Sequence, residues 1–250
     1  MIDSNKLVKS ALNLRQEVFQ AFVEHGEAHL GGSFSMIEIL IALYEEVLQP
    51  PDKFILSKAH ASFPLCLLLR EKGLFPALKT HLEIDPPNGI HATTGSLGHG
   101  LPIATGMALA RKWQGADGKI FVMISDGECQ EGTTWESLLI GAHHQLNNLL
   151  VLVDYNKIQA LSRVDDALSL DNLADKFRAF NWDCIEVEDG HDFYSIVSAL
   201  DKKSSGKPRA ILFHTVKGRG IPEFENDPAW HAKRIKEEEM KIGEQALNIK

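Results

Sequence analysis

Two polar residues, Asp126 and Asn156, each follow an apolar run of the sequence and could together bind a metal ion. The runs, 119–125 and 149–155, are rich in β-branched residues, and the amphipathic stretch between them completes a strand–helix–strand pattern. The strands of such a unit are parallel, so both polar residues reach the same edge of the sheet, where ligands of open α/β sheets bind. A carboxylate and an amide oxygen beside the backbone of Gly127 suit a magnesium ion that carries a diphosphate.

The same residues also have a simpler interpretation. An Asp-Gly pair after a strand is often only a turn, and asparagine is common in loops. Cys129, close to the pair, has no adjacent cationic residue to activate its thiol, which favours a small buried filler over a reactive nucleophile. The short pattern therefore needs support from the rest of the chain.

Composition sets the broad class of the protein. The chain has 250 residues, 44% hydrophobic and 24% charged, as in a soluble globular protein, and we expect residues 1–250 to form a single domain. A net charge of −8 without a long basic run argues against nucleic acid as a partner. No apolar run reaches the roughly 18 residues of a membrane span, and the N-terminus lacks a signal-peptide pattern. Three widely spaced cysteines suit a reducing compartment, so the sequence predicts a cytoplasmic protein without a membrane partner.

The order of the predicted elements indicates the fold. Strands alternate with helices along the chain, which is typical of a doubly wound, mainly parallel α/β sheet with helices on both faces. The irregular stretch 79–101 is long enough to be a functional loop, and a second glycine-bearing loop spans 216–222. Ser35 could cap the helix that follows it, with Glu38 at the capping-box position. Besides the two runs above, the sequence predicts helices at 4–25, 36–48, 60–72, 101–113, near 170–180, near 192–203 and at about 229–247, strands at 52–57, 184–187 and 209–216, and a glycine-rich turn at 29–35.

Eleven histidines are many for this length, and six of them fall in loops or at element ends that could reach the same sheet edge. A single histidine is more often structural than catalytic, but several on glycine-flanked turns favour a site. Zinc has little support because no tight ligand spacing such as His-Glu-x-x-His occurs. The sequence also lacks the nucleophile elbow, the dinucleotide-binding glycine pattern and a phosphate loop ending in Gly-Lys-Ser/Thr. The six are His29, His60, His81, His91, His99 and His231.

Taken in order along the chain, these motifs resemble the thiamine diphosphate-binding half of transketolase. The spacing of Asp126-Gly127 and Asn156 is similar to the thiamine diphosphate signature, an aspartate and an asparagine about thirty residues apart. Four further segments resemble family motifs: Asp52–His60 its strand-to-histidine segment, Thr80–Glu83 its His-Pro-Glu, Gly95–Gly100 its glycine-bearing loop, and Pro228–His231 its late histidine.

The resemblance implies a role for each matching residue. The implied ligands of Mg²⁺, which Ca²⁺ or Mn²⁺ could replace, are Asp126, Asn156 and the backbone carbonyl of Ile158. The implied catalytic residues are His29, His81 and His231, which would face the sugar substrate as hydrogen-bond donors or proton carriers. Glu131 and Glu136 would lie near the contact between the two halves of the active site. The implied binding residues for thiamine diphosphate are His60, Gly95, Ser96, Leu97, Asp126, Gly127, Glu128, Asn156, Ile158 and His231.

Three positions depart from the family pattern. His91 stands where the family usually has a glutamate, which bears on substrate contacts. Ser125 replaces the first glycine of Gly-Asp-Gly, a change that concerns local packing. Ala232 follows His231 in place of the usual glycine.

The resemblance covers about residues 10–235 and corresponds to one half of a transketolase. The family's second domain carries the glutamate that activates the aminopyrimidine ring of the cofactor. We therefore expect a transketolase-like subunit whose active site is completed by a partner chain, with two copies of each. Together they would transfer a two-carbon ketol unit from a ketose, with or without a phosphate, to an aldose.

Two alternatives remain open at this point. The alpha subunits of 2-oxo acid dehydrogenases or decarboxylases share the aspartate-to-asparagine signature but not the run of His29, His60, His81 and Thr93-Thr94-Gly95. A cofactor-binding module without activity is the other alternative, although an idle site has no need of both metal ligands.

Overall fold

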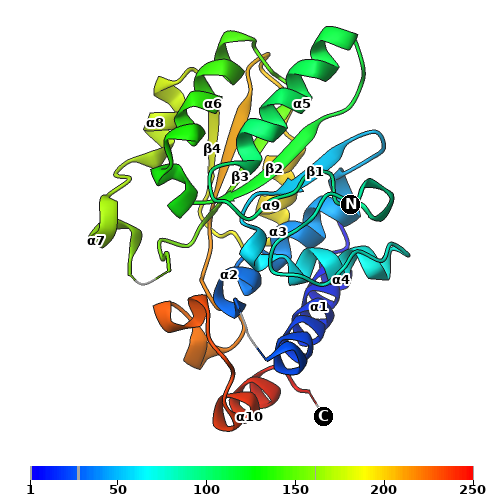
Figure 1. The fold of residues 1–250 in the computed structure, drawn as a ribbon, viewed down its shortest axis with the longest axis vertical. Coiled ribbons are helices and arrows are strands. Elements are labelled where there is room, and N and C mark those ends of the chain that lie inside the picture. The colour runs from blue at the N-terminus through cyan, green and yellow to red at the C-terminus, as the bar shows by residue number, and fades with distance from the viewer. Residues whose placement is uncertain (1, 27–28, 161, 250) are drawn as a thin grey trace.

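The computed structural model describes residues 2–26, 29–160 and 162–249. In these ranges five strands form one parallel sheet in the order β1-β2-β3-β5-β4. The predicted doubly wound, mainly parallel α/β fold is confirmed, since helices cover both faces of the sheet (Figure 1). The strands are β1 (Lys53–Leu56), β2 (Ile120–Ser125), β3 (Leu149–Tyr155), β4 (Asp183–Val187) and β5 (Arg209–His214). The helices are α1 (Ser4–His25), α2 (Leu30–Phe34), α3 (Ile37–Ala42), α4 (Phe63–Glu71), α5 (Gly100–Gln114), α6 (Gly132–His143), α7 (Val164–Leu168), α8 (Leu173–Ala179), α9 (Phe193–Leu200) and α10 (Glu237–Ala246).

Alternate residues of the central strands face the two helical layers, because side chains along a strand point to opposite faces. In β2, Phe121 and Met123 pack with α1, α3, α4 and α9, whereas Ile120, Val122 and Ile124 pack with α5, α6 and α8. Both faces are therefore buried, which explains why this strand has a continuous apolar sequence.

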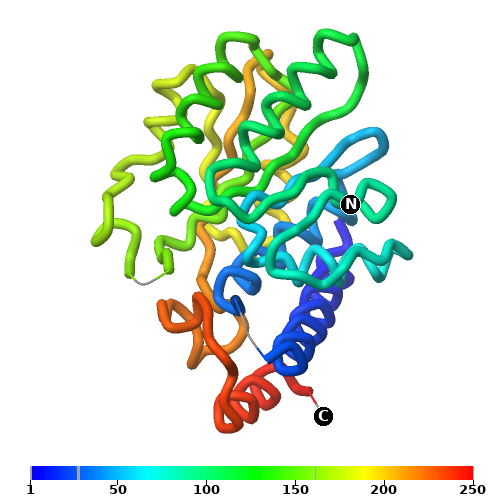
Figure 2. The backbone as a smooth tube through the Cα atoms, viewed as in Figure 1, coloured from blue at the N-terminus to red at the C-terminus, as the bar shows by residue number. Residues whose placement is uncertain are grey.

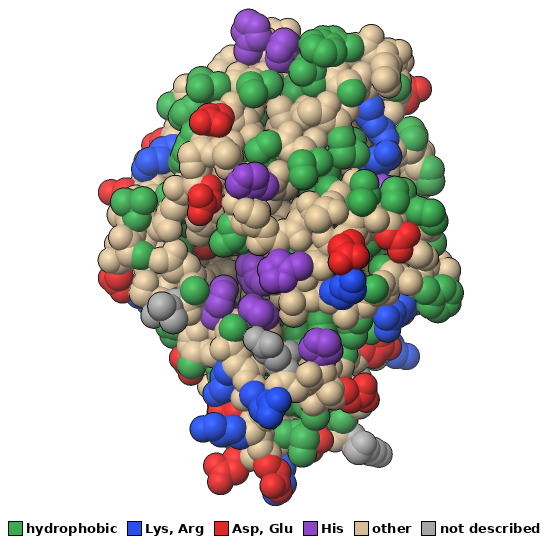
Figure 3. Space-filling view, viewed as in Figure 1, with side chains coloured by type: hydrophobic (Ala, Val, Ile, Leu, Met, Phe, Trp, Pro, Cys, Tyr) green, Lys and Arg blue, Asp and Glu red, His purple; other side chains and the backbone are tan. Residues whose placement is uncertain are grey.

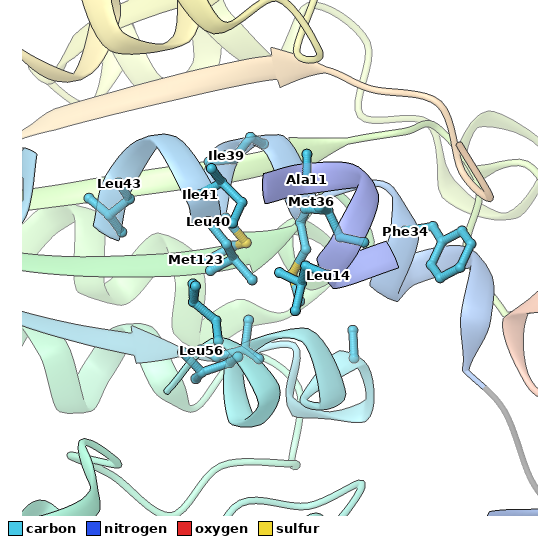
Figure 4. Close-up of a cluster of buried hydrophobic side chains, with 14 of the residues drawn as sticks. Ala11, Leu14, Phe34, Met36, Ile39, Leu40, Ile41, Leu43, Leu56 and Met123 are labelled. Carbon is cyan, nitrogen blue, oxygen red and sulfur yellow. The ribbon is translucent and has the colours of Figure 1, made fainter. Parts of the chain in front are cut away.

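The first of these layers fixes α1 and α3 against the sheet. Figure 4 shows apolar side chains of both helices, including Leu14 and Leu40, meeting Leu56 and Met123 of the strands. The C-terminal segment then runs past α2 and folds against α1 (Figure 2). There the Gln16 side chain donates to the Leu247 carbonyl (2.7 Å). Helices far apart in the sequence are thus held around one end of the sheet.

The central strands end at a common edge. Ser125 of β2 lies opposite Asp154 of β3, and Tyr155 of β3 lies opposite His214 of β5. The residues that follow the three strands are therefore neighbours, as the parallel pattern predicted. Among the described residues, no helix is long and apolar enough to cross a membrane.

Three predictions about local structure are wrong. The segment 29–35 is not a turn, because Leu30–Phe34 is helical and buried. Ser35 does not cap α3: its hydroxyl donates to Asp154 (2.6 Å) and lies 3.1 Å from the Gly32 carbonyl oxygen, while Glu38 pairs with Arg15 in place of a capping box. The last helix begins at Glu237 and not near 229, since Pro228–His231 forms a 3-10 turn capped by Asp227.

Candidate functional site

A cavity of about 150 Å³ opens at the carboxyl edge of the sheet. It is small beside the roughly 300–1,000 Å³ of pockets that enclose a drug-sized ligand, so it suits one polar end of a cofactor. Figure 3 shows histidine side chains gathered around a hollow on this face of the molecule. The lining residues are Gly32, Lys58, His60, Leu97, Ser125, Asp126, Gly127, Gln130, Glu131, Asn156, Ile158, Gln159, Ala160, Lys217 and His231.

Asp126 presents a buried carboxylate to this cavity and is only 1% exposed. Its oxygens accept hydrogen bonds from the backbone N–H groups of Gly127 (2.8 Å) and Lys157 (2.5 Å). Burial, with the charge of Asp154 nearby, nevertheless raises the pKa of Asp126 to about 7. A divalent cation at the carboxylate would favour the ionised form, so the environment of Asp126 fits a metal ion.

Asn156, the second candidate metal ligand, lines the same cavity, and hydrogen bonds to its neighbours fix its side chain. Its amide nitrogen donates to Asp154 (3.1 Å), and its amide oxygen accepts from the Ile158 backbone N–H (3.1 Å). The Ile158 carbonyl accepts from Lys217 (2.9 Å) and keeps a second lone pair. One carboxylate, one amide and one carbonyl oxygen form a hard donor set suited to magnesium. Among the described residues, no three His, Cys, Asp or Glu side chains are grouped as a metal site.

Asp154 is buried like Asp126 but differs in its partners. Lys58 forms an ion pair with it, and the hydroxyls of Ser35 and Thr215 donate to it. Burial opposes ionisation, but Lys58 and these donors together lower the pKa of Asp154. Asp154 is therefore a stable anion that orients Asn156 and Lys58 at the cavity.

Three histidines meet beside the candidate metal ligands. The ring centroids of His29, His60 and His231 lie 5.1–5.6 Å apart. Burial and the charge of Lys58 hold the pKa of His60 well below its usual range, and burial with Lys217 lowers that of His231 to about 4. His60 and His231 are thus neutral near pH 7, able to donate and accept hydrogen bonds but adding no charge.

Two lysines at the cavity were missed by the sequence analysis. Lys58 and Lys217 are 1% and 2% exposed, and both line the cavity. Lys217 donates to the carbonyls of Ile158 (2.9 Å) and Gln159 (3.0 Å), and burial with the nearby Lys58 lowers its pKa to about 8. The signal for Lys217 was its place in the glycine-bearing loop directly after a strand. Two cations around a small cavity favour an anionic ligand.

Of the loop Gly95–Leu97 and Glu128, which were predicted to bind the cofactor, one residue lines the cavity. Leu97 lines it, whereas Gly95 and Ser96 do not. The Glu128 side chain does not line the cavity: its carboxylate accepts from Ser57, Gly98 N–H (3.0 Å) and Ser125 N–H (2.9 Å), which holds the loop against β2.

The other three histidines that the sequence placed at the sheet edge do not line the cavity. His81 packs against Gly95, where a Cβ would come within 2.2 Å of its ring, and does not line the cavity. His99 precedes α5 and contacts Ser96. The prediction that His91 reaches the common edge of the sheet is wrong. Its charged neighbours Lys53 and Arg111 place it at the amino end of β1. Cys129 is fully buried and burial raises the pKa of its thiol, as expected for a filler.

Comparison with known proteins gives consistent matches. A family model described as "Transketolase, thiamine diphosphate binding domain" matches residues 8–250. A 6-deoxy-6-sulfo-D-fructose transketolase subunit of Clostridium sp. strain MSTE9 is 35% identical over 91% of each chain. One of the apulose-4-phosphate transketolase subunits of Actinobacillus succinogenes is 35% identical over 88% of this chain and 87% of the relative. The crystal structure of transketolase from Campylobacter jejuni matches 97% of this chain with a TM-score of 0.84 and 26% identity, but only 43% of that protein is covered.

Proposed function

The chain belongs to the transketolase family, and we propose that it is the thiamine diphosphate-binding subunit of an enzyme that transfers a two-carbon ketol unit from a ketose to an aldose. One observation carries the proposal: Asp126, Asn156 and Lys217 converge on a cavity at the carboxyl edge of the sheet. That cavity is sized and charged for a diphosphate with its metal ion.

Each group at the cavity has a part in holding the cofactor. We propose that the side chains of Asp126 and Asn156 and the carbonyl of Ile158 bind Mg²⁺. The Lys217 ammonium would bind diphosphate oxygens beside Gly127, with His60 and His231 as neutral hydrogen-bond partners. The loop Gly95–Leu97 would lie against the thiamine rings, with Leu97 as its contact at the cavity. The cofactor, once bound, supplies the carbanion chemistry.

The sugar would be handled by histidines at the rim. We assign His29 and His231, whose rings are 5.6 Å apart, to hydrogen bonds with the sugar hydroxyls, and His81 to the outer part of the substrate path. A neutral imidazole can take a proton at one nitrogen while it donates from the other, which suits proton transfer to and from a ketose oxygen. The two named relatives act on a sulfo sugar and a sugar phosphate, so we propose a ketose with an anionic terminal group as donor.

A partner chain would complete the site. The chain spans 43% of the Campylobacter jejuni transketolase, and two relatives of similar length are named as subunits. Large apolar side chains on α5 and α6 are exposed and would be covered by the partner: Ile103, Trp113, Leu139 and Ile140. Glu131 lines the cavity and Glu136 is exposed on α6, so both would lie near that contact. We propose an assembly with two copies of each chain, located in the cytoplasm.

Calorimetry tests cofactor binding. Titration of the full chain with thiamine diphosphate is expected to show binding that requires Mg²⁺, and Asp126→Ala is expected to lose it. Unchanged binding by Asp126→Ala would remove the proposed metal site. With the partner chain present, a donor screen of ketose phosphates and sulfo sugars against 2-oxo acids tests the reaction. Turnover of 2-oxo acids alone would contradict ketol transfer.

A further inference from the structure

A buried chain of hydrogen bonds links helices α1 and α3 to the loop after β4 and to the segment that follows β5. Arg15 of α1 donates to Glu38 of α3 (2.7 Å), and the other Glu38 oxygen lies 3.0 Å from Nδ1 of His191. The second ring nitrogen of His191, Nε2, accepts a hydrogen bond from the backbone N–H of Val216 (2.9 Å). The next residue along the chain is Lys217.

The two contacts of His191 fix where its proton lies. Because Nε2 accepts from the Val216 N–H, the ring carries its proton at Nδ1 and donates it to Glu38. Glu38 in turn is held by Arg15, so the orientation of the imidazole is determined from both ends.

The loop that carries His191 is pressed against the end of β5. The Gly190 N–H donates to the His214 carbonyl (2.8 Å). A Cβ at Gly190 would lie 2.7 Å from Cγ2 of Thr215 and 2.9 Å from the His214 carbonyl oxygen, so the approach requires glycine. His191 therefore reaches the Val216 backbone from a loop with little freedom to shift.

We infer that His191 is a positioning residue for the diphosphate site, acting through the backbone of Val216 on Lys217. Val216 is the point at which the chain leaves β5 for the cavity, and its hydrogen bond to His191 sets the direction in which Lys217 enters. Beyond it, Gly218 N–H donates to the Gly31 carbonyl (3.0 Å), so Lys217 is held between two fixed backbone contacts. The inference rests on the proposed binding of diphosphate by Lys217.

Two substitutions at His191 distinguish the two halves of the link between Glu38 and Val216, which are its contact with Glu38 and its contact with the Val216 backbone. In His191→Gln the amide oxygen can take the place of Nε2 and accept from the Val216 N–H. In His191→Asn the shorter amide can take the place of Nδ1 and donate to Glu38, but it offers no acceptor to Val216. A merely structural role predicts that cofactor affinity follows thermal stability in both variants.

Two measurements on the full chain test the link. Hydrogen exchange at residues 215–218, without cofactor, is expected to be faster in His191→Asn than in His191→Gln. Titration with thiamine diphosphate and Mg²⁺ is expected to show about tenfold weaker binding for His191→Asn, a factor typical of one lost second-layer contact, and near wild-type binding for His191→Gln.

The possible outcomes separate the link from the proposed function. Equal exchange in the two variants, or affinity that follows melting temperature, overturns the link. Normal binding by Lys217→Met overturns the role of Lys217 and with it the inference. If the wild-type chain bound no thiamine diphosphate, the proposed function would fail, while the exchange data would still decide whether His191 holds Val216. If exchange differs between the variants but their affinities do not, His191 orders the loop without positioning it for diphosphate.

Discussion

Two buried carboxylates, Asp126 and Glu38, lie in opposite electrostatic environments. Asp126 is 1% exposed and Glu38 is 7% exposed. Burial with the neighbouring Asp154 raises the pKa of Asp126 to about 7. Burial also acts against ionised Glu38, but Arg15 and His191 overcome it and hold the pKa of Glu38 at about 2. Burial alone therefore does not decide the state of either group; the partners decide it.

The opposite pKa shifts distinguish Asp126, which lies where a ligand would bind, from Glu38, which supports that part of the fold. The protein pairs Glu38 with its own cation, Arg15, so this carboxylate needs no ligand to balance its charge. The Asp126 region receives two backbone N–H groups, and a metal ion would add the positive charge that they do not supply. Substitution of Asp126 should consequently lower ligand binding directly, whereas substitution of Glu38 should mainly lower the free energy of unfolding.

The largest effect is expected from Asp126→Asn. The amide keeps the shape of the side chain but loses the charge that a magnesium ion needs, so affinity for thiamine diphosphate with Mg²⁺ should fall by about 100-fold or more. The melting temperature should change little, because removal of a buried carboxylate with a raised pKa offsets the loss of one of the two backbone hydrogen bonds that its oxygens accept. Calorimetry and thermal unfolding measure the two quantities. A large drop in melting temperature with unchanged cofactor affinity would show that Asp126 supports the fold and does not bind the ligand.

The second effect is expected from Glu38→Gln and concerns stability. The fall in pKa from 4.5 to about 2 corresponds to about 3 kcal/mol of unfolding free energy. A lowered acidic pKa stabilises the folded state above pH 4.5, and this contribution disappears as the pH falls towards 2. Urea unfolding at a series of pH values should therefore show a gap between wild type and Glu38→Gln at pH 7 that narrows below pH 4.5. A gap independent of pH would contradict the ion-pair explanation.

A third effect is expected at Gly31, which packs against Lys217 of the cavity. A Cβ at this helical glycine would lie 2.9 Å from both Cγ of Lys217 and the Trp230 carbonyl oxygen, so Gly31→Ala should displace Lys217 and cost about 1–3 kcal/mol. Cofactor affinity should fall about tenfold if Lys217 binds the diphosphate through a charge-assisted hydrogen bond. Gly106→Ala in α5 is the matched control, because a Cβ there meets nothing within 4 Å and alanine favours a helix. Equal behaviour of the two variants would show that Lys217 tolerates displacement.

The sequence predicted the strands and the meeting of Asp126 with Asn156 because both follow from local patterns and from the parallel rule. It did not predict Lys58 or Lys217 as cavity residues, since a buried lysine is unusual and depends on partners far away in the sequence, such as Asp154 and Ile158. The capping box at Ser35 and Glu38 had the right spacing. It failed because both side chains have buried partners from other elements.

The smallest effect is expected among the partners of Asp154. This carboxylate is charge-paired like Glu38, but it contacts Asn156 at the cavity. Ser35 donates to the ionised Asp154, whereas Ser33, in neighbouring α2, donates to the neutral His29 carbonyl (2.8 Å). A hydrogen bond to a charged group contributes about 1.5–3 kcal/mol and a neutral one about 1, so Ser35→Ala should destabilise the chain by about 1 kcal/mol more than Ser33→Ala. Urea unfolding of both variants measures the difference. Because Lys58, Thr215 and Asn156 still contact Asp154, cofactor affinity should change little in Ser35→Ala, and a large loss of affinity would assign Asp154 to the ligand-binding region instead.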